Sequence, residues 1–311
     1  MTAPTNTFQT YQAKGNREDL ANAIYRIAPT DTPFLSGISK VDASATYHEW
    51  QTQDLATAAN NAQIEGDDAS AAAVTATVRL GNYTQIATKT VIVSGTQDAV
   101  KKAGRGSELS YQLTLKGLEL KRDMETGLTQ NGTHNAGAGA TARQARGLEG
   151  WIQTNNDFGA SGAAPSWGSN TAATDGTQRA FTETQLKNVL QLIWVQGGKP
   201  DMLMLGGTQK QTFSTFTGGR TLYNDAAGKK LAAAISVYVS DFGDVKAVPN
   251  RFQRARTAFA VQSNMWAVAT LRPMFTKKLA DTGDAQKRQL IVEYTLEARQ
   301  EKSSGAVRDL S

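Results

Sequence analysis

The stretch that most constrains the fold is residues 107–130, because it predicts one helix of unusual length. Ser107 is a good N-cap, since its hydroxyl can accept a hydrogen bond from a backbone N–H of the first turn. Asn131-Gly132 predicts where the helix stops. At ~1.5 Å per residue the helix would be roughly 36 Å long, about twice the mean helix length in globular proteins. A helix of this length is either the core helix of a mixed domain or a spine across which strands and loops are laid.

Apolar residues recur along this segment at helical spacing and predict which side of the helix is buried. We expect Leu113, Leu120 and Met124 to face the core, covered by strands from the far end of the chain at 257–271 and 289–298. Gly117 lies on this apolar stripe. Because it has no side chain, it would let a second backbone come close to the helix.

Two strand-like segments, 46–55 and 78–93, flank a polar stretch that has no core pattern. They predict a long β-hairpin with a large tip, and so long a loop is usually functional or reaches toward a partner. Residues 41–88 carry six acids and one base, whereas residues 101–146 carry eight bases and four acids. We therefore expect the acidic loop to lie over a neighbouring copy, near the basic spine of that copy. The acids chosen for this inter-subunit contact are Asp54, Glu65, Asp67 and Asp68, and the bases are Lys101, Lys102, Arg105, Lys116, Lys121 and Arg122.

A second amphipathic helix is predicted at 182–196. Thr182 and Gln185 have the spacing of a capping box, and Trp194 falls on the expected apolar face, so we expect it to be buried. Short strands and a helix alternate after it, which indicates an α/β sub-domain inserted at 181–250. The predicted elements are strands at 202–205 and 235–240, a helix at 208–216, and a turn at 241–244.

The residues that usually carry chemistry are scarce in this chain. It has no cysteine and two histidines, His48 and His134, neither of which has a partner at metal-ligand spacing. The run GAGA at 137–140 follows a helix instead of a strand, so it lacks the context of a dinucleotide site. We expect no catalytic, cofactor-binding or metal-binding residues and no enzymatic activity. The formal net charge of +5 permits contact with a polyanion, and no apolar run is long enough to span a membrane.

The order of these parts resembles the major capsid proteins of tailed bacteriophages, which have the Hong Kong ninety-seven fold. Four local phrases resemble the branch typified by the phage SU-ten major head protein. The phrases are APTDTPFLSGISK (28–40), YHEWQTQDLA (47–56), RGLEGWI (146–152) and KPDMLMLGG (199–207). The resemblance implies an α+β fold with five parts. These would be an N-arm at 1–40 containing a short helix at 17–27, an extended loop at 41–95, a peripheral domain at 96–152, an axial domain at 153–250, and returning peripheral strands at 251–311.

The resemblance also implies a function. Copies would assemble as hexamers and pentamers into an icosahedral virion capsid, formed in the host cytoplasm, that holds double-stranded DNA without reading its sequence. Separate scaffold, portal and decoration proteins are the other partners it suggests. Some relatives crosslink through a lysine of the extended loop, but residues 41–88 contain no lysine. Two alternatives remain open from the residues alone: another self-assembling shell, such as a cellular nanocompartment, and an enzyme with an unrecognised site.

Overall fold

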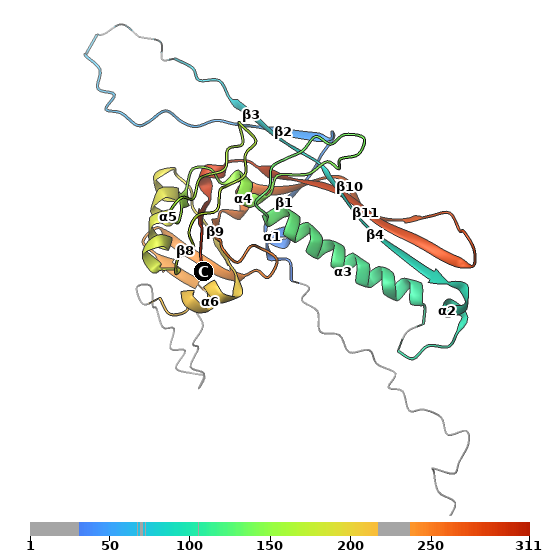
Figure 1. Ribbon diagram of the computed structural model, residues 1–311. Coiled ribbons are helices and arrows are strands. Elements are labelled where there is room, and N and C mark those ends of the chain that lie inside the picture. Colours follow the sequence, from blue (N-terminus) through green and yellow to red (C-terminus); the bar gives the residue numbers. More distant parts are fainter. Residues whose placement is uncertain (1–30, 67, 69–70, 72, 105, 217–236) are drawn as a thin grey trace, which may run out of the picture.

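The computed structural model describes residues 31–66, 68, 71, 73–104, 106–216 and 237–311. They form a body with two β-sheets, a long helix along one of them, and a hairpin that projects from the body (Figure 1). The helix expected at 17–27 and most of the N-arm expected at 1–40 lie outside the described residues. In the part of the chain that is described, no helix is long and apolar enough to cross a membrane.

The predicted long helix forms as α3, Glu108–Thr129. Ser107 caps it, because its side chain accepts a hydrogen bond from the backbone N–H of Ser110. The helix ends beside Asn131-Gly132 as predicted, but not through a glycine cap, since the chain already becomes extended at Gln130 and Gly132 does not adopt a left-handed conformation.

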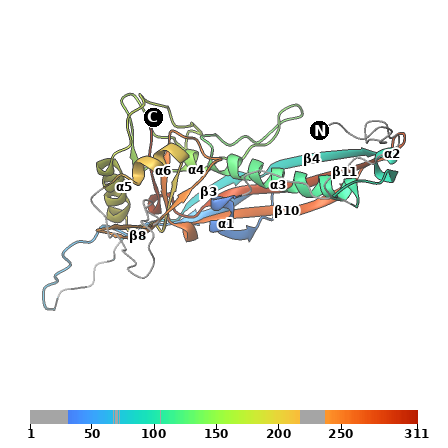
Figure 2. The same ribbon diagram turned by 90° about the horizontal axis from the view of Figure 1, so that it is seen from below.

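A four-stranded sheet lies beside α3, in the order β1-β10-β11-β4 (Figure 2). Its strands are β1 Ser39–Asp42, β4 Gln85–Ser94, β10 Trp266–Lys278 and β11 Ala285–Ala298. β1 runs parallel to β10, and the other neighbours are antiparallel. Leu120 and Met124 of α3 are buried in the same core as Val292 and Leu296 of β11. Leu113 is half-buried and also contacts a smaller cluster that includes β4, so the late strands share the covering of α3 with β4.

The close approach expected at Gly117 occurs at another glycine. Nothing lies within 4 Å of the position where a Cβ of Gly117 would stand. At Gly127, one turn from the end of α3, that position is 3.0 Å from the hydroxyl of Tyr294 on β11. The close contact at a glycine of α3 is therefore with a tyrosine side chain near the C-terminal end of the helix.

A six-stranded sheet forms the second part of the body, in the order β5-β12-β9-β6-β8-β7. Two of its strands come from residues 251–311, the range expected to return to the first sheet. The physical cause is a break in the run 257–271 at a 3-10 turn, η1 Ser263–Met265, which sends β9 to one sheet and β10 to the other. The strands are β5 Asn156–Asp157, β6 Met202–Leu205, β7 Val237–Ser240, β8 Gly243–Pro249, β9 Ala258–Val261 and β12 Gly305–Val307.

The second amphipathic helix forms as α5, Glu183–Val195, with the predicted capping box between Thr182 and Gln185. Leu186, Val189, Leu190 and Ile193 are buried against the six-stranded sheet. The prediction that Trp194 is buried is wrong, because its side chain is 58% exposed. One helical step of about 100° turns it away from Ile193 and out of the core. A second helix of this region, α6 Gly207–Phe213, lies near the predicted 208–216.

The hairpin consists of β2 Tyr47–Thr52 and β3 Val78–Tyr83, which pair antiparallel from Tyr47–Tyr83 to Thr52–Val78. The second predicted arm, 78–93, divides into two strands, because β4 pairs with β11 in the four-stranded sheet. The hairpin therefore ends near Tyr83, whereas the extended loop was expected to continue to residue 95. Short helices occupy three connections: α1 Pro33–Gly37, where only turns were expected, α2 Gly95–Ala99 and α4 Leu148–Trp151. A 3-10 turn, η2 Glu301–Ser303, precedes β12.

Candidate assembly surfaces

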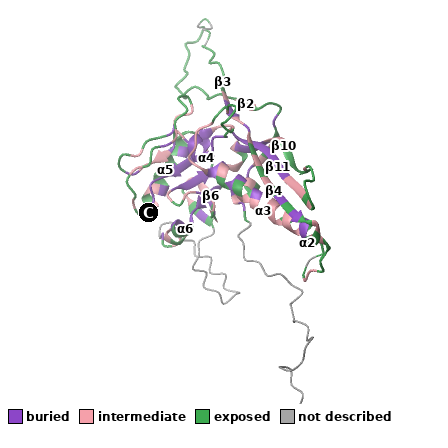
Figure 3. Ribbon diagram, turned by 45° about the vertical axis from the view of Figure 1, so that its right-hand side comes forward, coloured by how far each residue is buried: buried purple, intermediate pink, exposed green. Residues whose placement is uncertain are grey.

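The tip of the hairpin is the most exposed part of the described chain (Figure 3). Its apolar side chains are in solvent, with Leu55 98% and Val74 94% exposed and Ile64 not far below. Glu65 and Asp68, two of the acids chosen from the sequence, are exposed in the same tip, while Asp67 lies outside the described residues. Exposed apolar side chains beside acids are the composition expected of a surface that another molecule covers.

Asp54 does not belong to this exposed tip. Its carboxylate accepts a hydrogen bond from Gln300 Nε2 at 2.8 Å and pairs with the ammonium group of Lys302, both at η2. One acid chosen for contact with a neighbouring copy therefore holds the hairpin to its own body.

The root of the hairpin is tied down at a second place. His48 Nε2 lies 2.8 Å from Glu297 Oε2 on β11. The Glu297 carboxyl is partly desolvated, but its hydrogen bonds with His48 and Arg299 outweigh this and lower its pKa. The second histidine, His134, also contacts this root, since the rings of Tyr47 and Tyr83 pack against it at 6.5 and 5.5 Å between centroids.

A buried arginine joins the root to the loops behind it, a role the sequence analysis missed. Arg146 donates to the carbonyl oxygen of Gly150 at 2.9 Å and to Asn170 Oδ1 at 2.6 Å. Burial lowers its pKa to about 10. Asn82 of β3 donates to the backbone carbonyls of Arg146 and Leu296, so hairpin, loop and sheet share one hydrogen-bonded junction. In the sequence, this residue is an arginine between two glycine-rich stretches. That pattern does not indicate which groups the arginine contacts.

The basic residues chosen around the spine helix are partly engaged within the chain. Lys116 pairs with Glu119 at 2.8 Å on the same helix, and Lys102 donates to the backbone oxygen of Asp98 at 2.8 Å. Lys101 and Lys121 are exposed and Arg122 is half-buried. Arg105 lies outside the described residues.

Sequence reasoning did not find a further group of bases at the far end of the four-stranded sheet. They stand where β10 and β11 approach their connecting turn, and Ile92 of β4, which pairs with Lys287, is exposed beside them. The alternation of side chains in these strands is visible in the sequence. The sequence does not show which face of the four-stranded sheet α3 covers. The bases are Lys277, Lys278, Lys287 and Arg288.

A buried carboxylate anchors the first described helix to the spine. Glu125 of α3 is fully buried and accepts hydrogen bonds from the backbone N–H groups of Phe34 and Leu35, at 2.9 and 2.8 Å, and from Asn250 Nδ2 at 2.7 Å. Burial raises the pKa of Glu125, and the three hydrogen bonds oppose that rise. The start of α1, α3 and the end of β8 are thereby fastened at one point.

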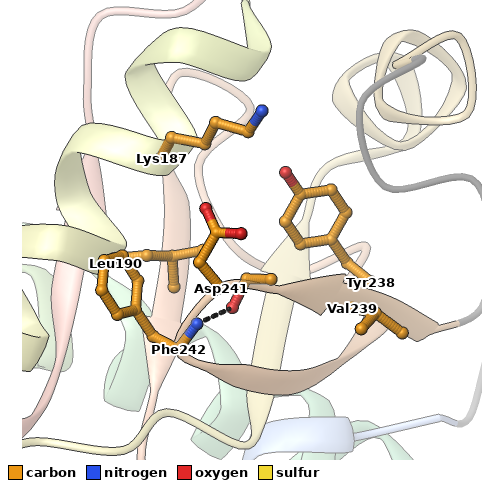
Figure 4. Close-up of a pocket in the computed structure, with 7 residues that line it drawn as sticks. Lys187, Leu190, Tyr238, Val239, Asp241 and Phe242 are labelled. Carbon is orange, nitrogen blue, oxygen red and sulfur yellow. Dashed lines mark hydrogen bonds between the residues drawn. The ribbon is translucent and has the colours of Figure 1, made fainter.

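A small hollow opens between α5 and the β7–β8 turn (Figure 4). Lys187 and Leu190 of α5 line it from one side, and Tyr238 and Asp241 from the other. Glu183 pairs with Lys187 at 3.0 Å and accepts a hydrogen bond from the Tyr238 hydroxyl at 3.1 Å. These contacts hold α5 on its sheet, and in the described residues no group of three or more histidine and acidic side chains is arranged to bind a metal ion.

Comparison with known proteins places the whole chain in one family. The family model of the SU10 major capsid protein matches residues 3–311. The major capsid protein of Escherichia phage Phieco32 is 27% identical over 350 residues, which cover 99% of this chain and 97% of that protein.

Solved phage capsids have the same fold. The asymmetric unit of the bacteriophage PhiM1 mature capsid matches with a TM-score of 0.62 at 11% identity, covering 97% of this chain and 96% of that one. The structure of Microbacterium phage Oxtober96 matches with a TM-score of 0.63 at 11% identity, covering 94% and 96%. The predicted α+β fold of the Hong Kong ninety-seven type is confirmed. The chain therefore belongs to the SU10 major capsid protein family and is a structural component of a tailed-phage capsid.

Proposed function

We propose that copies of this chain form hexamers and pentamers of an icosahedral head, and that the hairpin tip of each copy lies over a neighbour. The observation that carries this proposal is the hairpin itself. Its root is clamped by Asp54 and His48, while its tip exposes Leu55, Ile64 and Val74 to solvent. A segment that is held at one end and uncovered at the other is suited to reach another molecule.

The charges of the tip indicate what it meets. Glu65 and Asp68 are exposed there, and Lys101 and Lys121 are exposed along the spine region where a neighbouring copy would present them. Each exposed pair contributes only about 0–1 kcal/mol, so the electrostatic part of the contact is collective and weakens with salt. Burial of the apolar side chains supplies the part that does not depend on salt.

The test removes the tip and leaves the root. Deletion of residues 58–76 keeps Asp54, β2 and β3, so we expect a folded, soluble monomer that assembles poorly. Sedimentation and negative-stain microscopy measure shell formation, and circular dichroism checks the fold. The matched control replaces the same residues with a glycine–serine linker of equal length, which should assemble as poorly as the deletion. Normal shells from either variant contradict the proposal.

The shell encloses double-stranded DNA, and contact with it is electrostatic. The formal net charge is +5, and sequence-independent binding of this kind falls steeply as salt rises. Competition between unrelated duplexes should show no preferred sequence, and a strong preference for one site would refute this part. Assembly takes place in the host cytoplasm. Scaffold and portal proteins are separate chains, and a decoration protein has a precedent in the phage G structure, which contains gp27 major capsid proteins and gp26 decoration proteins.

A further inference from the structure

The described chain passes between the four-stranded and the six-stranded sheet at three places, and all three meet at one short segment. The first crossing leads from α4 to β5, the second from β9 to β10 through η1, and the third from β11 to β12 through η2. We call residues 299–304, which contain η2, the η2 crossing. Figure 1 shows the hairpin leaving the body where the two sheets adjoin. The contacts of the η2 crossing show how the hairpin and the two sheets are connected.

A buried carboxylate of η2 holds the first crossing. Glu301, 8% exposed, accepts hydrogen bonds from the backbone N–H groups of Gln153 and Thr154 at 3.0 and 3.1 Å. Asn155, also buried, donates its side-chain amide to the backbone oxygen of Lys302 at 2.7 Å. Buried polar groups are almost always hydrogen-bonded, because an unpaired one is costly. These bonds therefore fix the path from α4 to β5 against η2.

The residue that follows η2 holds the second crossing. Ser304 is fully buried, and its Oγ accepts hydrogen bonds from the backbone N–H of Gln262 at 3.1 Å and from Trp266 Nε1 at 2.8 Å, on either side of η1. The backbone N–H of Arg299 donates to the carbonyl oxygen of Met265 at 3.0 Å. The η2 crossing is thus bonded to each of the other two crossings.

Two partly exposed side chains of the η2 crossing reach outward to the hairpin. Gln300 Nε2 donates to Asp54 Oδ1 at 2.8 Å, and the Lys302 ammonium group pairs with the same carboxylate. The side chains of this ion pair are open to solvent, with Lys302 33% and Asp54 54% exposed. Such a pair opens at a much smaller cost than the buried bonds on the other side of η2. A weak contact therefore joins the hairpin to the segment that holds both sheets.

We propose that the η2 crossing couples the hairpin to the packing of the two sheets. With Asp54 engaged, Gln300 and Lys302 are held in place, and Glu301 between them keeps its carboxylate on the first crossing. With Asp54 released, η2 gains freedom and the crossings open more often. A contact that favours the position of the hairpin then stabilises the packing of the sheets, and the converse holds by linkage. This coupling is a property of the single chain, so it goes beyond the proposed function and does not depend on hexamers or pentamers.

Hydrogen exchange of the unassembled chain tests the coupling. The reporters are the backbone N–H groups of Gln153, Thr154 and Gln262, whose acceptors belong to the η2 crossing. Asp54→Ala removes the attachment of the hairpin and leaves each of these bonds in place. We expect exchange of the reporters to become about two- to fivefold faster, the range that an exposed ion pair allows. Reporters that exchange at the wild-type rate overturn the proposal.

The matched control removes an equally exposed ion pair elsewhere in the body. Lys89 of β4 pairs with Asp123 of α3 at 2.7 Å, and their side chains are 31% and 51% exposed. Asp123→Ala should lower the overall stability as much as Asp54→Ala does, but leave the exchange of the reporters unchanged. Equal acceleration in both variants would mean that the crossings open only when the whole chain unfolds, and would overturn the proposal.

Exchanging the charges of the attachment gives a sharper result. Asp54→Lys brings two ammonium groups together and should speed the exchange of the reporters more than Asp54→Ala does. Combined with Lys302→Asp, it restores the pair with its signs reversed, and exchange should return to near the wild-type rate. A double variant that remains as fast as Asp54→Lys would show that the reporters do not respond to this contact, and would overturn the proposal.

Discussion

The two amphipathic helices differ in how much of their apolar surface the chain covers by itself. On α3, Leu120 and Met124 are buried under strands of its own sheet. On α5, the core face is covered, but Trp194 and Val195 remain exposed at the end of the helix. Both helices are capped and periodic. On both helices the periodic face is therefore covered by the same chain, and the exposed apolar residues at the end of α5 lie off that face.

The hairpin repeats this contrast within a single element. Its root is joined to the body through His48, Asp54 and Asn82, and its tip exposes Leu55 and Val74. Apolar burial inside one chain stabilises the monomer, whereas apolar surface left outside it stabilises only an assembly. Substitutions in the two kinds of region should therefore have different consequences.

The largest expected effect is at the covered surface of α3. Leu120→Asp would place an unpaired carboxylate in the core, which should destabilise the monomer by about 3–5 kcal/mol. We expect insoluble protein and no capsomers, measured by fractionation of cell lysates. Leu55→Asp is the control at the uncovered tip and should give soluble monomer. A Leu120→Asp protein that behaves as wild type would break the comparison at its strongest point.

The second prediction concerns the anchor of α1. Glu125→Ala removes the acceptor for the N–H groups of Phe34 and Leu35 and for Asn250, and three buried donors left unpaired should cost on the order of 3 kcal/mol. Urea unfolding of the soluble protein measures the loss. Glu125→Gln keeps one acceptor oxygen and should lose less. If the two variants are equally stable, the carboxylate does not hold α1 in the way its geometry indicates.

The third prediction lies on the uncovered surface of α5. Because Trp194 is exposed, Trp194→Ala should remove little more than the stacking on Phe242, about 0.5–1.5 kcal/mol. If Trp194 were buried, the same substitution would lower the stability by about 3–5 kcal/mol. Thermal unfolding of the monomer decides between the two values. Ile193→Ala, one residue away and fully buried, is the control and should lose about 2–5 kcal/mol.

The smallest expected effect is on the pH dependence at the hairpin root. Burial, followed by the charge of Arg146, lowers the pKa of His134 below 6.5. The unfolded chain therefore binds a proton before the folded one does as pH falls through 6.5, so this group destabilises the fold progressively below that pH. Urea midpoints of wild type should fall more steeply than those of His134→Gln between about pH 7 and pH 5. Parallel curves would show that His134 titrates equally in both states.

Several features of the assembly surfaces were accessible from sequence and others were not. The long hairpin, its exposed acidic tip and the second capped helix follow from alternation, composition and capping residues, which are local properties. Asp54 was assigned to the contact with a neighbouring copy because its partners within the chain, Gln300 and Lys302, are more than two hundred residues away. Asn82 and Leu296 are also more than two hundred residues apart. No local pattern specifies which remote group a polar side chain will meet.

Local patterns predicted the long helix at 107–130, the hairpin, the capped helix at 182–196 and the family to which the chain belongs. How those elements cover one another depends on the tertiary structure. β4 pairs in the four-stranded sheet and not in the hairpin, and β9 pairs in the six-stranded sheet. The side chain of Trp194 is exposed to solvent. The physical reason is that hydrogen bonding and apolar periodicity act over a few residues, while strand partners and the covering of a helix face depend on contacts between residues far apart in the chain.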